Sequence, residues 1–392
     1  MFKINPYRPG AGLMPTFLAG RENDIEEIKN IFEALKHNIP TQSIIYSGLR
    51  GVGKTVLMNK FYTIAKEMDL FCEYVEIDEK KDFTSIISDA AQEFLKKAGI
   101  KEKGRPFMQK ALDALKSLVL SFNPEDTTFS LSVQERELYV ARSYERSLTQ
   151  VFTSIGEIAY ETEIPVCFII DEIQYMKKDE LGALISAIHR ANQLGYPIIV
   201  IGAGLPKIIK MLSDVKSYSE RLFDYKTVGS LTEEQAEKAI IEPARKFNVE
   251  YSKKATDRIF ELTKGYPFFI QQFCKIVYDV ADGKYIDIEF VEENINKFFE
   301  ALDNGFFKSR YERCSDMEKV FVFSMVKCEK LPCTISNISK HFGKNGKSIS
   351  PIRAKLIDKG IIYPTKHGEL DFTVPEFDGF IKRLGEYEEW KR

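Results

Sequence analysis

Two kinds of hydrophobic pattern alternate along the first 230 residues. Continuous apolar runs at residues 44–46, 165–170 and 197–204 are typical of strands that are buried on both faces of a sheet. Residues 71–77 alternate like a strand with one covered face. The segments with helical spacing of apolar residues are 24–35, 56–67, 83–97, 144–161 and 181–194. Because strands and helices alternate, the sequence predicts an α/β fold with a parallel sheet and helices on both of its faces.

The pattern changes after residue 228, where the strand-like runs stop. Segments with helical periodicity then predict an all-α lid, and they are 232–247, 253–263, 268–281 and 287–302. Three shorter helical segments follow at 315–326, 334–342 and 350–359. Two strand-like pieces, 361–364 and 370–374, then flank a Lys-His-Gly turn. This order is typical of a winged helix-turn-helix domain. We expect Ser350 to be the N-cap of its third helix and Pro351 to be the first helical residue.

These patterns divide the chain into four predicted parts. The parts are an extended arm rich in Pro and Gly at 1–19, an α/β core at 20–230, a helical lid at 231–304 and a winged-helix domain at 305–392. Residues 100–140 are interpreted as an insertion into the core. Within them, 106–120 predicts a helix, 123–128 a polar turn and 129–133 is compatible with a short strand.

The composition is that of an ordinary globular protein, with 392 residues, 44% hydrophobic and 29% charged. No stretch approaches the roughly 18–20 apolar residues of a membrane span, and the first residues lack the apolar core of a signal peptide. Six scattered cysteines predict reduced thiols and a cytoplasmic protein, and the lack of an apolar span predicts no membrane partner. The four histidines are widely spaced and give no metal-site pattern.

The segment between the first apolar run and the next helix carries the candidate chemistry. Residues 48–55, GLRGVGKT, match G-x-x-x-x-G-K-[ST] at each fixed position and stand between a strand and a helix. Glycines let the backbone wrap a phosphate, and the new helix adds unpaired N–H groups. Lys54 would neutralise the β- and γ-phosphates of ATP, and Thr55 would ligate Mg²⁺. The alternative is a glycine-rich turn before an ordinary helix, and a chance match to the motif in a chain of this length is expected about once in a hundred from residue frequencies. The residues expected to bind the nucleotide here are Gly48, Leu49, Arg50, Gly51, Val52, Gly53, Lys54, Thr55 and Val56.

Two adjacent acidic residues end the apolar run at 165–170. Asp171 and Glu172 would lie at the carboxyl edge of the sheet, where ligands of such folds bind. We expect Asp171 to hold Mg²⁺ through water and Glu172 to orient and polarise the attacking water. Acidic residues often end apolar strands, so this pair gains its meaning from the phosphate loop that precedes it.

With these motifs in view, the chain resembles the AAA+ and STAND group of P-loop ATPases. It is most similar to the archaeal-type ATPase family and, more distantly, to origin-recognition-type initiators and transposition ATPases. The resemblance runs from about Phe17 to the end of the chain and is weakest at 100–140. It implies a P-loop NTPase fold, binding of ATP or ADP with Mg²⁺, ATP hydrolysis, and assembly with further copies or a partner protein.

Shorter matches within this resemblance imply further site residues. Gly20 and Arg21, in a G-R-E stretch, would line the adenine side of the pocket, and Asp171-Glu172-Ile-Gln174 matches the second motif of these ATPases. In the G-x-P element of the lid, Pro267 would approach the nucleotide, although a helix cap followed by proline explains the same residues. Arg221 would reach the γ-phosphate of a neighbouring copy, with a solvent-exposed or internally paired arginine as the alternative.

The fourth strand departs from the family pattern. It ends in Gly202-Ala203-Gly204, where such ATPases usually carry a polar residue that senses the γ-phosphate. We therefore expect slow, switch-like hydrolysis and not the rate of a fast motor.

The charge of the chain is unevenly distributed. The net charge is −2, yet residues 327–366 hold eight lysines and one arginine against two acidic residues. A basic winged helix predicts binding of double-stranded DNA, with phosphates bound by Lys344, Lys347, Arg353, Lys355 and Lys366. Lys359 is also expected to point outward.

The sequence thus predicts an ATPase switch that couples its nucleotide state to DNA binding. A signalling or defence ATPase of the STAND kind, whose C-terminal region binds protein, is the first alternative. A phosphotransferring kinase is the second, and the acidic pair and the helical lid disfavour it because both suit water as the acceptor.

Overall fold

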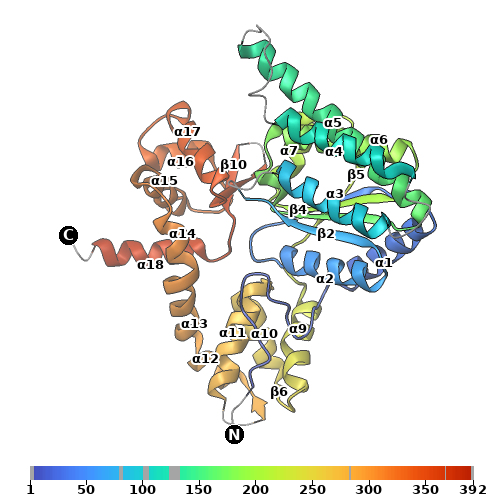
Figure 1. Cartoon of the computed structure of the whole chain (residues 1–392). Coiled ribbons are helices and arrows are strands. Elements are labelled where there is room, and N and C mark those ends of the chain that lie inside the picture. The colour runs from blue at the N-terminus through green and yellow to red at the C-terminus, as the bar shows by residue number, and fades with distance from the viewer. Residues whose placement is uncertain are drawn as a thin grey trace. The chain divides into compact units, whose positions relative to one another are not determined.

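Figure 1 shows the computed structural model of the chain, which describes residues 4–78, 83–99, 106–122, 133–281, 284–366 and 368–389. The chain forms two compact units. The sheet unit contains Arg21–Gly48 and Lys54–Val228, and the helical unit contains Met1–Gly20, Leu49–Gly53 and Gly229–Arg392. Among the helices described, none is long and apolar enough to cross a membrane.

The sheet unit is built on five parallel strands. They are β1 (Ser43–Ser47), β2 (Phe71–Glu76), β3 (Val166–Asp171), β4 (Ile198–Gly204) and β5 (Phe223–Thr227). Their order is β2-β3-β4-β1-β5, so β4 lies between β1 and β3. The predicted P-loop NTPase sheet is therefore confirmed. β5 was not predicted because it is an edge strand whose polar residues, Asp224 and Lys226, interrupt any apolar run.

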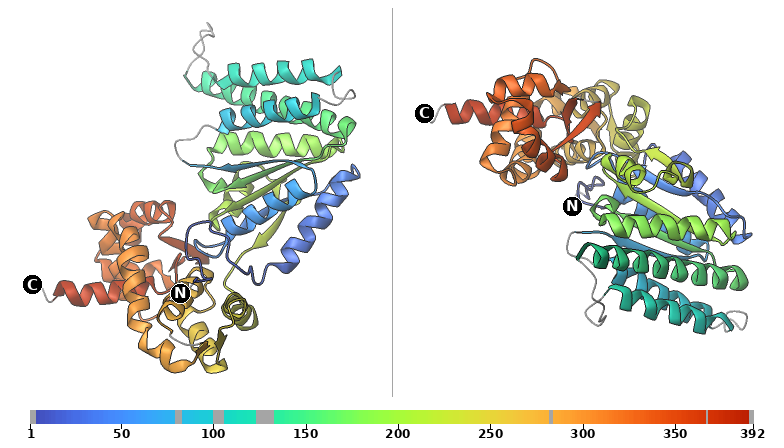
Figure 2. Two further views of the ribbon diagram at one scale, coloured as in Figure 1. Left: turned by 60° about the horizontal axis from the view of Figure 1, so that its bottom comes forward. Right: turned by 90° about the horizontal axis from the view of Figure 1, so that it is seen from above.

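Helices cover both faces of this sheet, as predicted (Figure 2). On one face lie α1 (Glu22–Lys36) and α2 (Lys54–Glu67). On the other face lie α3 (Phe83–Gly99), α5 (Val133–Thr162) and α6 (Lys178–Gln193), with α4 (Met108–Phe122) outside them. A short 3₁₀ turn follows β3 at Ile173–Tyr175, and α7 (Lys207–Val215) and α8 (Ser219–Leu222) connect β4 to β5.

The region interpreted as an insertion belongs to the core of the sheet unit. Leu115 and Leu118 of α4 are buried in the same hydrophobic cluster as Leu148 and Phe152 of α5 and Phe168 of β3. The predicted turn at 123–128 lies outside the described residues. The predicted strand at 129–133 does so too, except for Val133, which is the first residue of α5. This helix begins before residue 144, where we had placed its start.

The lid of the helical unit consists of helices, as predicted, with one small addition. The helices are α9 (Glu233–Arg245), α10 (Lys253–Thr263), α11 (Pro267–Val280), α12 (Ile288–Glu293) and α13 (Ile295–Ala301). β6 (Glu250–Tyr251) and β7 (Tyr285–Ile286) form a short parallel pair. The expectation that strands stop after residue 228 was therefore wrong, because two residues are too few to give a hydrophobic pattern.

The N-terminal arm has no helix or strand at residues 4–19 and packs on the lid. Tyr7 is buried, and its hydroxyl donates a hydrogen bond to the carbonyl of Ile240 in α9. The side-chain amide of Asn5 donates to the carbonyl of Lys275 in α11 at 2.9 Å. The arm is thus fixed by the lid helices.

The C-terminal part starts with a π-helix, η4 (Leu302–Phe307), that runs into α14 (Lys308–Glu312). The following elements are α15 (Asp316–Val326), β8 (Cys333–Thr334), α16 (Ile335–Phe342), α17 (Gly346–Asp358), β9 (Ile362–Lys366), β10 (Glu369–Phe372) and α18 (Phe377–Glu389). The predicted three helices and two strands are present, and β8 pairs with β10 as a third strand. β8 and α18 were not predicted.

The start of α17 corrects one prediction. Asn345, and not Ser350, is the N-cap, and its Oδ1 accepts a hydrogen bond from the N–H of Ser348 at 2.9 Å. Pro351 lies inside the helix and not at its first position. The Asn345 side chain satisfies an N–H group at the helix start, so the helix begins earlier than the proline suggests.

Aromatic side chains join the lid to the C-terminal part within the helical unit. Phe298 of α13 stacks on Phe273 of α11 with ring centroids 4.5 Å apart. Farther along, Phe307 of η4 stacks on Phe380 of α18 at 5.6 Å. Phe269 of α11 joins the two pairs, with its ring centroid 6.0 Å from those of Phe298 and Phe307, so one apolar core continues from α11 to α18.

Candidate nucleotide site

The predicted phosphate loop leaves β1 and enters α2. The N–H of Gly48 donates to the carbonyl of Gly204 at 3.1 Å, which ties the start of the loop to the end of β4. Gly51 and Gly53 have φ angles of +82° and +95°, which residues with a side chain rarely adopt. Lys54 is the first residue of α2, and its Nζ donates to the carbonyl of Gly48 at 2.9 Å. The loop therefore has the closed backbone and the buried ammonium group that a phosphate requires.

Two candidate oxygen ligands for a metal ion, from Thr55 and Asp171, lie beside the phosphate loop. Thr55 Oγ1 donates to Asp171 Oδ2 at 2.7 Å, so the two predicted Mg²⁺ ligands lie side by side. Hydroxyl and carboxylate oxygens are the donors that Mg²⁺ prefers. The residues present thus fit a magnesium ion, which Thr55 and Asp171 would hold.

Tyr74 of β2 belongs to the same network and was missed from the sequence. Its hydroxyl donates to Asp171 Oδ2 at 3.0 Å. Burial and then the negative charge of Asp171 raise the pKa of Tyr74 well above its usual value, so the hydroxyl keeps its proton. The only signal in the sequence is that residue 74 lies in the segment 71–77, which was predicted to be a strand.

Glu172 is held in an unusual conformation immediately after β3. Its φ of +54° is left-handed, and its N–H donates to Asp171 Oδ1 at 2.8 Å. Its carboxylate accepts a hydrogen bond from the Gln174 side-chain amide. The predicted general base is therefore oriented by a neighbour in the same motif.

Gln174 also explains the glycines that end β4. Its Oε1 accepts from the N–H of Leu205 at 3.0 Å, and the residue is buried. A Cβ atom at Gly204 would lie 2.6 Å from that Oε1, so any side chain there would displace the Gln174 amide. The Gln174 amide thus occupies the place at the strand end where a polar residue was expected, and it links β4 to Glu172.

The G-R-E stretch divides between the two units. Gly20 has a φ of +67°, and a Cβ there would lie 2.7 Å from the side-chain carbon Cδ of Gln235 in α9. Arg21 is the residue before α1, and burial lowers its pKa. Their contact with adenine stays a prediction.

The G-x-P element has the geometry of a helix start. Gly265 has a φ of +68°, and a Cβ there would lie 2.2 Å from the carbonyl oxygen of Leu231. Pro267 is the first residue of α11, as the capping interpretation predicts. The middle residue, Tyr266, contacts the phosphate loop, since a Cβ at Gly51 would lie 3.0 Å from the tyrosine ring.

Arg221 lies in α8, just before β5. Its carbonyl accepts a hydrogen bond from the Gln42 side chain at 2.9 Å, while its side chain is exposed. Within the described part of the chain the guanidinium has no acidic partner. The alternative of an internal ion pair is thus not observed, and the role toward a neighbouring copy stays a prediction.

The predicted DNA contacts lie on and around α17. Lys344, Lys347, Lys355 and Lys366 are exposed and Arg353 is half-buried, and none forms an ion pair with the described residues. Lys359 differs, because its Nζ contacts Glu318 Oε2 at 2.5 Å and donates to the carbonyl of Arg313 at 2.9 Å. The expectation that Lys359 points outward was wrong: it compensates the buried Glu318 carboxylate.

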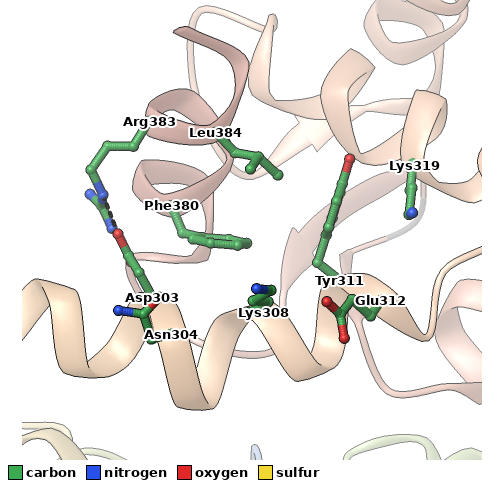
Figure 3. Close-up of a pocket in the computed structure, with 9 residues that line it drawn as sticks. All are labelled: Asp303, Asn304, Lys308, Tyr311, Glu312, Lys319, Phe380, Arg383 and Leu384. Carbon is green, nitrogen blue, oxygen red and sulfur yellow. Dashed lines mark hydrogen bonds and ion pairs between the residues drawn. The ribbon is translucent and has the colours of Figure 1, made fainter. Parts of the chain in front are cut away.

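A cavity of about 510 Å³ lies in the C-terminal part, between the helix formed by η4 and α14 and the later helix α18 (Figure 3). Arg383 pairs with Asp303 at 2.5 Å on one side, and the rings of Phe380 and Tyr311 meet edge to face, 6.1 Å apart. Its lining combines aromatic rings with charges of both signs and contains none of the predicted nucleotide residues.

Two domain families match parts of the chain. Residues 18–201 match the AAA ATPase domain family, and residues 304–381 match a domain family of unknown function, DUF8462. No curated protein matches the chain. The first match spans the phosphate loop and the Asp171-Glu172 pair, and it supports an AAA+ P-loop ATPase.

Among solved structures, the chain is similar to a Walker-type ATPase of Pyrococcus abyssi, PABY2304, at a TM-score of 0.54 and 13% identity, covering 93% of this chain and 96% of that one. Other matches are Aeropyrum pernix ORC1 in complex with DNA (TM-score 0.46, 14% identity, 94% and 95% covered) and Pyrobaculum aerophilum Cdc6p (0.45, 16%, 97% and 97%). The similarity to the Pyrococcus ATPase establishes a shared fold.

Proposed function

We propose that the protein binds Mg·ATP at the loop 48–55 and hydrolyses it to ADP and phosphate. The hydrogen bond between Thr55 and Asp171 is the observation that carries this proposal, since it joins the phosphate loop to the acidic strand end. Mg²⁺, when bound, would neutralise phosphate charge. Lys54 would leave the Gly48 carbonyl for the β- and γ-phosphates, and the loop N–H groups would bind the remaining oxygens.

Glu172 would act on the attacking water. Its carboxylate accepts one hydrogen bond from Gln174, which fixes its orientation and leaves the other oxygen for a water molecule. Because Gln174 also holds the end of β4, the position of Glu172 depends on that strand. We expect slow turnover, as for a switch, and we expect Arg221 of a neighbouring copy to complete the charge around the γ-phosphate.

Phosphate release by the purified protein tests hydrolysis. We expect free phosphate from ATP in the presence of Mg²⁺ and none after chelation. Transfer of the phosphate to an acceptor, with no free phosphate, would instead favour a kinase. Tight ATP binding without either product would leave a nucleotide-binding switch and contradict the catalytic role of Glu172.

We further propose that the nucleotide state is coupled to double-stranded DNA through a winged-helix domain at the C-terminus. The support is the order of helices and strands together with exposed lysines that have no acidic partner among the described residues. Such lysines suit phosphates, because no internal contact must be broken on binding. A STAND-like signalling ATPase is the second candidate, and the cavity of mixed polarity beside α18 favours it, since it suits a protein segment.

Duplex binding across a salt series, with and without Mg·ATP, separates the two candidates. ATP-dependent binding that weakens steeply with salt supports the DNA-binding switch. Absence of binding at low salt in every nucleotide state overturns it and favours a protein partner.

A further inference from the structure

A tyrosine hydroxyl beside the phosphate loop is buried without a partner. Tyr266 is only 1% exposed, and its hydroxyl oxygen would lie 3.0 Å from a Cβ at Gly51. That hydroxyl makes no hydrogen bond with any of the residues that the structure describes. Both residues belong to the helical unit, which includes Leu49–Gly53 of the loop. A buried donor without a partner costs free energy unless a ligand accepts its hydrogen bond.

An arginine from the start of the C-terminal part lies near this tyrosine, because the Tyr266 ring packs on Phe269, 4.8 Å between centroids, and Phe269 packs on Phe306 at 5.9 Å. Arg310 of α14 stacks its guanidinium on Phe306 of the π-helix η4, 4.2 Å from the ring centre. Its Nε is buried without a hydrogen-bond partner, and no carboxylate of the described residues pairs with it. A π-helix is rare and is often found at functional sites, and here α14, which contains Arg310, continues directly from it.

Two positive charges meet at this tyrosine. Burial and then the positive charge of Arg50, in the phosphate loop, lower the pKa of Arg310 to about 10, so Arg310 remains charged at neutral pH. Burial raises the pKa of Tyr266, while Arg310 and Arg50 act in the opposite direction. Like charges at a buried hydroxyl repel one another, and an anion between them would remove that repulsion.

We propose that Arg310, Arg50 and the Tyr266 hydroxyl together bind a phosphate group of the nucleotide held by the loop 48–55. The proposal rests on the proposed function and adds its regulation. A guanidinium binds phosphate oxygens through two parallel hydrogen bonds, and the tyrosine donates a third. Because Arg310 lies in α14, the helix that comes before α15 in the chain, the phosphate would fix the beginning of the C-terminal domain. The nucleotide is then sensed within the same chain, by a residue that the phosphate-loop motif does not contain.

The test measures ATP and ADP affinity of the full-length protein by titration calorimetry. We expect Arg310→Ala to weaken binding of at least one nucleotide by about tenfold or more, and Arg310→Lys to weaken it less. Tyr266→Phe removes only the hydroxyl and should weaken binding about threefold to tenfold. Arg313→Ala is the matched control, because this exposed arginine ends the same helix, and it should stay within twofold of wild type.

The outcomes separate this proposal from the proposed function. If the unmodified protein binds ATP and Lys54→Ala does not, while Arg310→Ala and Tyr266→Phe bind ATP and ADP as wild type, the phosphate role of Arg310 is overturned and the nucleotide site stands. If the unmodified protein binds no nucleotide, the proposed function fails first. Should Arg310→Ala not fold, Tyr266→Phe decides alone: a purely structural tyrosine would change thermal stability but not nucleotide affinity.

Discussion

Charged side chains are held in opposite ways at the phosphate loop and around α17. At the loop, Lys54 and Asp171 are buried and hydrogen-bonded to named partners. Around α17, Lys347 and Lys355 are exposed and have no acidic partner among the described residues. Buried charges held in fixed positions can select one small ligand, because each position is specified by its neighbours. Exposed lysines act through their summed charge, so each one matters little.

The largest effect is expected from Glu172→Gln. The variant loses the carboxylate that would polarise water, so ATP hydrolysis should fall by about 10²–10⁴-fold. The amide keeps the size of the side chain and leaves the Thr55–Asp171 contact intact. ATP affinity should therefore stay within a few fold of wild type. Hydrolysis rate and affinity measured on one preparation check this, and a variant with unchanged turnover would remove Glu172 from the mechanism.

Lys54→Ala tests the contribution of the buried lysine to ATP affinity. The variant removes the buried ammonium group from the loop, and ATP affinity should fall about 10–100-fold, since a hydrogen bond to a charged group contributes about 1.5–3 kcal/mol. Lys60→Ala, in the same helix α2 but away from the loop, is the control and should bind normally. Titration with ATP measures both. Tight binding by Lys54→Ala would contradict the site.

The nucleotide loop could be predicted from the sequence because its chemistry is local. Eight consecutive residues specify the backbone turn, the lysine and the threonine, and flanking patterns specify the strand and helix. Asp171 and Glu172 were found because a long apolar strand carries them. Tyr74, Tyr266 and Arg310 were missed, since only the folded chain brings them to the site and single polar residues leave no pattern.

Similar reasoning explains the errors in the fold. Edge strand β5 contains polar residues, and β6 and β7 have two residues each, so none of these three strands gives a periodic hydrophobic pattern. The start of α17 was placed at a serine before a proline, whereas Asn345 caps the helix earlier. Lys359 was judged from helical spacing, which cannot show that Glu318, from another helix, lies opposite it.

Gln174→Ala tests whether the hydrogen bonds that Gln174 makes with Glu172 and Leu205 support both ATP hydrolysis and stability. Loss of the amide leaves the Leu205 N–H without its partner and releases the Glu172 carboxylate. We expect about tenfold slower hydrolysis and a free energy of unfolding lower by about 1–3 kcal/mol. Gly204→Ala should act in the same direction, because the new Cβ would displace the Gln174 side chain. Turnover and chemical denaturation measure both effects, and Gln193→Ala, an exposed glutamine, serves as control.

The smallest effect belongs to the exposed lysines, and a matched pair in α17 and at its end tests it. Lys355→Ala removes one exposed charge, so duplex affinity should fall about two- to threefold and the salt slope should be lower by about one. Its free energy of unfolding should stay within about 0.5 kcal/mol of wild type.

Lys359→Ala should instead lower the free energy of unfolding by about 1–3 kcal/mol, because Glu318 loses its partner. Although burial raises the pKa of Glu318, the hydrogen bonds from Lys359 and Ser315 lower it overall. The stability that this pair provides is therefore present above the unfolded pKa and is lost as the pH falls through the lowered pKa, and Lys359→Ala should weaken that acid dependence. Denaturation at several pH values and duplex titration on both variants check the pair. Equal losses of DNA affinity without any loss of stability would show that the two lysines do not differ.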